Sequence, residues 1–170
     1  LGSGVSTNQL YDKLQSNPDE LIERAVAAVK YAKKYVEEVE FYAEDAGRAK
    51  TESLARVVEA VIAAGATVVN LPDTTGYCMP QDFGAKIKYL IDNVSNVDKA
   101  IIATHFHNDL GMATANTLAG VLNGARQVEV TINGMGGRAG NTALEEGVRA
   151  RRCHKGYGID TDIDATLITK

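Results

Sequence analysis

The stretch Ala100-Ile101-Ile102-Ala103-Thr104-His105-Phe106-His107-Asn108-Asp109 joins a short apolar run directly to histidine, amide and carboxylate side chains. A near-continuous apolar run is typical of a strand covered on both faces, as in a parallel sheet. Because the polar residues follow the run without a break, we predict that they lie at the carboxyl end of that strand. Both common parallel α/β architectures place their functional residues at this end.

The order of strand, loop and helix recurs along the chain. Strand-like runs begin near residues 38, 67, 100 and 127, about 30 residues apart, the size of a strand–helix–strand unit. We predict helices over 51–64, 81–94, 112–123 and 142–153, after an earlier one that begins at Asn17-Pro18 and ends near Tyr35. In this prediction Thr51 caps the first of these and Gly65 ends it. No linker interrupts the series, so residues 1–170 form one domain.

This periodicity fits an open doubly wound sheet and a TIM barrel equally well. A barrel has eight units and typically about 250 residues, so this chain would supply only part of one. The polar residues favour the barrel, because consecutive strands end in Glu44-Asp45, Asp73-Thr74, His105–Asp109 and Asn133–Asn141. Packing alone does not explain four consecutive units with polar groups at one rim.

Composition excludes several classes of partner. The net charge is −4, with 22 acidic and 18 basic residues, whereas nucleic acids and anionic membranes require a concentrated basic face. No apolar stretch approaches the roughly 20 residues of a membrane-spanning helix, and no signal peptide is visible. Cys78 and Cys153 are far apart in the sequence. We therefore expect free thiols in a reducing, cytoplasmic environment.

His105 and His107 are the residues with the most chemical potential. Residues two apart on a strand face the same side, and neutral imidazole is a common ligand of divalent metals. The alternative is a pair of hydrogen-bonded loop histidines, but the position at a strand end favours a metal site. The third histidine, His154, lies at a basic helix end, so further ligands should be oxygen or amide donors.

The loop from Gly134 to Asn141 is rich in glycine but has neither the spacing of a P-loop nor that of a dinucleotide-binding turn. Its glycines permit tight turns and close approach of the backbone to a ligand. Arg138 could bind an anionic substrate group or neutralise Glu145 or Glu146. Its chemistry leaves both options open.

Four segments together resemble the 2-isopropylmalate synthase family. They are VEFYAEDAGR (39–48), NLPDTTGY (70–77), HFHNDLGMA (105–113) and GMGGRAGN (134–141), the last followed by ALEE (143–146). They occur in the family's order, and the resemblance covers roughly residues 18 to 164. The wider group of metal-dependent barrel enzymes also includes homocitrate synthase, citramalate synthase and 3-hydroxy-3-methylglutaryl-CoA (HMG-CoA) lyase.

The resemblance implies a TIM barrel, of which residues 1–170 would form about the last five β/α units without the first strands. It implies a Claisen-type condensation of acetyl-CoA with the 2-oxo acid 2-oxoisovalerate, giving 2-isopropylmalate in leucine biosynthesis. By position, the implied ligands of a divalent metal (Mn²⁺, Zn²⁺ or Mg²⁺) are His105, His107 and Asn141. Glu44 matches an active-site carboxylate and Thr74 a residue of the 2-oxo acid pocket, while Arg138 stays a candidate for substrate binding. A structural hydrogen-bonding role is the alternative for Glu44.

The sequence also departs from this family. The family's RDGEQ-type motif, which carries an arginine and a metal-binding aspartate, is not found, and Gly137 stands where the family usually has Glu. In 147–152, glycine and arginines replace an apolar stretch, and Gly147 costs about 1 kcal/mol relative to Ala inside a helix. A homocitrate synthase-, citramalate synthase- or HMG-CoA lyase-like activity is one alternative. Another is a catalytically incomplete, metal-binding partial barrel that needs a partner chain. Because open strand edges and apolar faces favour association, we expect a homo-oligomer, most simply a dimer.

Overall fold

A computed structural model describes residues 1–168 and contains one five-stranded parallel sheet. Its strands are β1 (Gly2–Gly4), β2 (Glu40–Glu44), β3 (Val68–Asp73), β4 (Ile101–Phe106) and β5 (Gln127–Glu129). They lie side by side in chain order, each parallel to the next. A doubly wound sheet would reverse its strand order at a switch point. The unreversed order therefore confirms the predicted partial TIM barrel.

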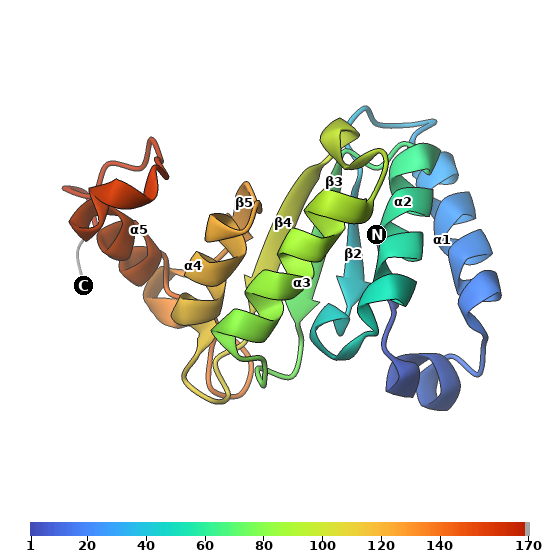
Figure 1. Cartoon of the computed structure of the whole chain (residues 1–170), viewed down its shortest axis with the longest axis horizontal. Helices are drawn as coiled ribbons and strands as arrows, with labels where there is room; N and C mark the ends of the chain where they lie inside the picture. The colour runs from blue at the N-terminus through green and yellow to red at the C-terminus, as the bar shows by residue number, and fades with distance from the viewer. Residues whose placement is uncertain (169–170) are drawn as a thin grey trace.

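The helices lie along one face of this sheet (Figure 1). They are α1 (Pro18–Ala32), α2 (Thr51–Ala64), α3 (Pro80–Asn93), α4 (Ala113–Leu122) and α5 (Leu144–Cys153). Short helical turns are η1 (Gln9–Lys13), η2 (Ala46–Arg48), η3 (Val97–Lys99), η4 (Ile132–Gly134) and η5 (Lys155–Tyr157). None of the helices within residues 1–168 has the length and apolar content needed to cross a membrane.

The helix ends have the capping residues predicted from the sequence, with one exception. The side chain of Asn17 accepts hydrogen bonds from the backbone N–H groups of Asp19 and Glu20, both at 3.0 Å, and Pro18 opens α1 as predicted. Gly65 ends α2 with a φ of +113°, a conformation that glycine adopts without steric cost. The prediction that Thr51 caps α2 is wrong. Thr51 is the first helical residue, and the preceding Lys50 makes no side-chain capping bond.

The core lies between the sheet and the helices. Alternate strand residues, among them Phe41, Leu71 and Phe106, point toward the helices and are almost fully buried. Phe106 packs edge-on against Phe83 of α3, with ring centroids 4.5 Å apart. Burial of each such side chain contributes about 1.5–3 kcal/mol. This layer therefore determines which face of each strand packs against the helices and which face is turned away from them.

The strands differ in length from the prediction. β3 and β4 pair over six positions and extend to Asp73 and Phe106, so His105 lies inside a strand and not after it. β5 is short and ends at Glu129, because the chain then turns into η4. β1 ends at Gly4, although the Val5 N–H still bonds to the carbonyl of Glu44 at 3.0 Å.

None of the described helices covers the opposite face of the sheet, and the middle of this face is polar. Its middle carries Glu40, Asn70, His105, Gln127 and Glu129, which are connected by hydrogen bonds. In a closed barrel this face would line the interior. Tyr42 and Ile101, which alternate with the buried Phe41 and Ile102, add exposed apolar surface to the same face.

Candidate metal centre

His105 and His107 lie next to each other at the carboxyl end of β4. Their ring centroids are 5.1 Å apart, so the imidazoles share one side, as the two-residue spacing predicts. Both line a hollow of about 310 Å³ on the open face of the sheet. The remaining lining residues are Glu40, Tyr42, Glu44, Asn70, Pro72, Thr74 and Glu129. The structure thus brings the two histidines together with two other predicted site residues, Glu44 and Thr74.

Asn141 reaches this site because its loop adds to the end of β4. The Asn108 N–H bonds to the Gly140 carbonyl at 2.9 Å, and the Thr142 N–H bonds to the Phe106 carbonyl at 3.2 Å. His107 and Asn141 consequently form an antiparallel bridge. Gly140 has a φ of +96°, and a Cβ atom there would lie 2.3 Å from the backbone carbonyl oxygen of Gly134, so this turn of the loop requires glycine.

Unsatisfied polar atoms indicate that a cation fits between these residues. Nδ1 of His107 and Oδ1 of Asn141 are buried, and neither has a hydrogen-bond partner among the described residues. Buried polar atoms normally have a hydrogen-bond partner or bind an ion, so these two atoms are candidate ligands of a cation. Within residues 1–168, no three His, Cys, Asp or Glu side chains form a cation site by themselves. The donor set is therefore two imidazoles and one amide oxygen.

The surroundings keep both imidazoles neutral, which is the form that binds metals. Burial lowers the pKa of His105, and the neighbouring His107 lowers it further. Burial also lowers the pKa of His107, with a second contribution from Arg138. At neutral pH each ring therefore offers a nitrogen lone pair.

Glu129 is a site residue that the sequence analysis missed. Its Oε2 lies 3.1 Å from Nδ1 of His105. Burial, then a hydrogen bond to Glu40, raises the pKa of Glu129 to about 7. The available signal was the alternation Gln127-Val128-Glu129, which puts two polar side chains on the inner face of a short strand.

Glu44 ends β2 and lines the hollow, where Gln9 donates to its Oε1 at 3.4 Å. Beside it, the Asp45 N–H donates to the hydroxyl of Thr74 at 2.9 Å. A hydroxyl that accepts a hydrogen bond keeps its own hydrogen for donation. Thr74 is thus fixed in position and able to donate toward a bound ligand.

Two other rim carboxylates have structural partners. Asp45 is buried at a φ of +66° and accepts hydrogen bonds from Ser6 and Arg48. Asp73 is fully buried and accepts from the N–H groups of Gly76, Tyr77 and Cys78 at 2.9–3.3 Å. These two side chains shape the loops around the site.

Arg138 makes a two-pronged ion pair with Asp109, with N–O distances of 2.6 and 2.7 Å, and donates to the Thr74 carbonyl at 2.9 Å. The alternative that it neutralises Glu145 or Glu146 is wrong. Glu145 accepts from the Asn133 N–H, and Glu146 accepts from the Thr114 hydroxyl. Arg138 ties three rim loops together, and its role in substrate binding stays a prediction.

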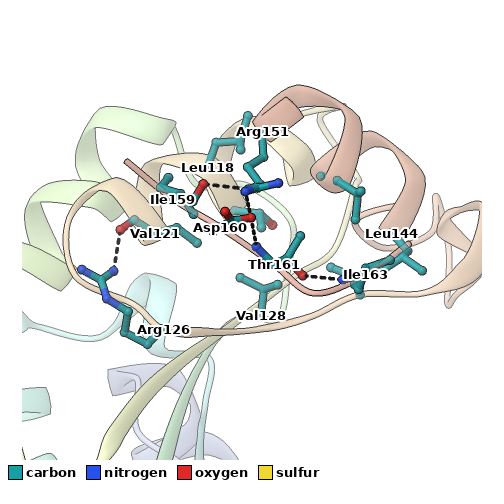
Figure 2. Close-up of a pocket in the computed structure, with 14 residues that line it drawn as sticks. Leu118, Val121, Arg126, Val128, Leu144, Arg151, Ile159, Asp160, Thr161 and Ile163 are labelled. Carbon is teal, nitrogen blue, oxygen red and sulfur yellow. Dashed lines mark hydrogen bonds and ion pairs between the residues drawn. The ribbon is translucent and has the colours of Figure 1, made fainter. Parts of the chain in front are cut away.

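A second hollow, of about 180 Å³, lies away from this site between α4, β5, α5 and the segment 159–163 (Figure 2). Apolar side chains such as Leu118, Val128 and Ile163 line it. Arg151 anchors the covering segment by donating to the Ile159 carbonyl at 2.7 Å and by pairing with Asp160. Because its lining is mainly apolar and its one carboxylate is paired, we assign this hollow to packing.

Comparison with known proteins adds context to this geometry. The model of the HMGL-like family matches residues 1–170. The chain is similar to a 2-isopropylmalate synthase of Parabacteroides distasonis, with 65% identity over 98% of this chain and 33% of the relative. It is equally similar to a protein of that name from Olsenella uli, with 65% identity over 99% and 32%. The chain spans about a third of the length of these relatives.

Solved structures share the fold at low sequence identity. An HMG-CoA lyase of Bacillus subtilis matches with a TM-score of 0.77 and 20% identity, covering 97% of this chain and 57% of that one. An Acinetobacter baumannii HMG-CoA lyase in complex with coenzyme A and 3-methylmalate matches with a TM-score of 0.74 and 20% identity, covering 99% and 57%.

Proposed function

This chain belongs to the HMGL-like family, and from that premise we propose that it is part of a 2-isopropylmalate synthase. That enzyme would condense acetyl-CoA with 2-oxoisovalerate in leucine biosynthesis. The observation that carries the proposal is the meeting of His105, His107 and Asn141 at one rim, with unsatisfied donor atoms on His107 and Asn141. Glu44 and Thr74 line the adjoining hollow.

The substrate assignment draws on the relatives. The curated relatives at 65% identity carry the name 2-isopropylmalate synthase, and a structure with the same fold is a complex with coenzyme A. Since this chain spans about a third of those relatives, the complete reaction is assigned to the full-length protein. The part described here would supply metal ligands and one wall of the substrate site.

In the proposed reaction, the acetyl methyl group loses a proton and its carbon bonds to the ketone carbon of the 2-oxo acid. The ketone oxygen then takes up a proton, and water cleaves the thioester to release the CoA thiol and a carboxylate. A divalent metal, when bound, polarises the ketone as a Lewis acid. His105, His107 and Asn141 would hold that metal, Thr74 would donate a hydrogen bond to the 2-oxo acid, and Glu44 would accept and return protons.

Release of CoA thiol tests this proposal. The 170-residue chain and the full-length protein would each be incubated with acetyl-CoA, 2-oxoisovalerate and Mn²⁺ or Zn²⁺, and free thiol followed with a chromogenic disulfide. We expect thiol release by the full-length protein that Glu44→Gln greatly reduces. Pyruvate and 2-oxoglutarate in place of 2-oxoisovalerate test the citramalate and homocitrate alternatives, and a preference for either would contradict the substrate assignment.

A catalytically incomplete, metal-binding partial barrel is the second candidate. Two observations favour it for the isolated chain: the polar inner face has no cover, and the described residues contribute no carboxylate-containing cation site. Stoichiometric metal binding without thiol release by the 170-residue chain would support this candidate. Dimerisation measured by light scattering would then test whether a second copy covers the open face.

A further inference from the structure

The contact between His105 and Glu129 follows from strand register. His105 of β4 and Glu129 of β5 are direct partners in the parallel pair, so their side chains leave neighbouring strands on the same face. The result is a separation of 3.1 Å between Nδ1 of His105 and Oε2 of Glu129. A one-residue shift in register would turn Glu129 to the helix-covered face and remove the contact.

This contact selects one of the two neutral forms of the imidazole. A neutral ring carries its hydrogen on one nitrogen and a lone pair on the other, whereas an ionised carboxylate only accepts hydrogen bonds. When it is ionised, Glu129 therefore favours a hydrogen on Nδ1 of His105, which leaves the lone pair on Nε2. A carboxylate that holds a ligating histidine in this way also raises its basicity as a ligand.

Glu40, the other acid on this face, hydrogen-bonds to Glu129, and the structure shows no hydrogen bond between Glu40 and His105. Glu40 accepts a hydrogen bond from the Asn70 amide at 3.2 Å and another from the Gln127 amide at 3.3 Å. His107 differs from His105, because its buried Nδ1 has no hydrogen-bond partner in residues 1–168. Among the described residues, a carboxylate thus contacts Nδ1 of His105, whereas Nδ1 of His107 has no such partner.

We propose that Glu129 is a positioning residue of the metal site, which fixes His105 as its Nδ1–H form so that Nε2 is the ligand atom. The inference rests on the metal site of the proposed function and extends it to a residue that the family motifs did not identify. In this role Glu129 acts on the metal site through His105.

Nitrogen NMR of the metal-free, ¹⁵N-histidine-labelled chain tests directly whether His105 is the Nδ1–H form. At about pH 8 the rings are neutral, and long-range proton–nitrogen correlations distinguish the two ring forms. We expect His105 to be the Nδ1–H form in the wild type and to move toward the Nε2–H form in Glu129→Ala. Glu129→Gln should keep the wild-type form, because its amide oxygen still accepts a hydrogen bond. Glu40→Gln is the comparison variant, since it removes the acidic neighbour that hydrogen-bonds to Glu129 but leaves Glu129 and its contact with His105 in place.

Calorimetric titration with Zn²⁺ or Mn²⁺ tests whether Glu129 supports metal binding. We expect Glu129→Ala to weaken metal affinity by about 10- to 100-fold, and Glu129→Gln and Glu40→Gln to weaken it less. An Nε2–H form of His105 in the wild type would overturn the proposal without any variant. An equal effect of Glu40→Gln and Glu129→Ala would also overturn it. If His105 has the expected form but the wild type binds no metal, the proposed function fails instead.

Discussion

Lys86 of α3 holds the loop that follows Glu44. Its replacement by methionine tests how much this contact contributes to the free energy of unfolding. The ammonium group donates to the carbonyls of Ala46, Gly47 and Ala49 at 2.8, 2.7 and 2.8 Å. These carbonyls belong to the turn that follows the end of β2. Methionine keeps most of the side-chain length and apolar stem but leaves all three carbonyls without this donor.

The expected loss follows from these three bonds. A hydrogen bond from a charged donor contributes about 1.5–3 kcal/mol, so three give about 5–9 kcal/mol before opposing effects. Burial lowers the pKa of Lys86, which shows that desolvation of the ammonium offsets part of the gain. Water can also reach the carbonyls in the variant, because Lys86 is only half-buried. We therefore expect Lys86→Met to lower the free energy of unfolding by about 2–4 kcal/mol.

Urea unfolding followed by far-UV circular dichroism measures this loss. Lys88→Met is the matched control on the same helix, because Lys88 forms an exposed ion pair with Asp92 four residues later. Such pairs contribute only about 0.3–0.5 kcal/mol. If Lys86→Met is no more destabilising than Lys88→Met, the three carbonyl contacts do not hold the loop and the reasoning is refuted.

Three further predictions concern other parts of the chain. Asn17→Ala removes the acceptor for two N–H groups of α1 and should lower the free energy of unfolding by about 1 kcal/mol; an unchanged urea midpoint would contradict the capping role. Gly147→Ala should raise it by about 1 kcal/mol, because the glycine is inside α5 and a Cβ there meets no atom within 4 Å; a lower melting temperature would show that the position is more crowded than described. Burial raises the pKa of Cys78 to about 12, so at pH 8 a thiol reagent should modify the exposed Cys153 much faster than Cys78, and Cys153→Ser should abolish the fast phase.

The repeating units were predictable because they depend on local patterns. Helix α2 has the predicted limits 51–64, since its apolar spacing and Gly65 fix its length within the segment. The choice between barrel and doubly wound sheet required strand order, which no local pattern contains. The end of β4 was underestimated, because His105 is an unusual strand residue that pairing with Pro72 of β3 accommodates.

The metal site was predictable only in part. The pair His105 and His107 follows from the alternation of side chains along a strand, whereas the arrival of Asn141 depends on backbone bonds between two separate loops. Glu129 was missed because its contact with His105 depends on the register of β5 against β4. The partner of Arg138 was also missed, because Asp109 lies 29 residues away in the sequence and meets it only across the rim.

The most direct test of the central claim is calorimetric titration of the 170-residue chain with Zn²⁺ or Mn²⁺, measured for the wild type and for single histidine variants. We predict one ion per chain, with binding lost in His105→Ala and in His107→Ala. His154→Ala is the control, because His154 is exposed and stacks on Tyr157 at the far end of the fold; its binding should equal that of the wild type. Absence of binding to the wild type, or binding that survives both His105→Ala and His107→Ala, would contradict the account.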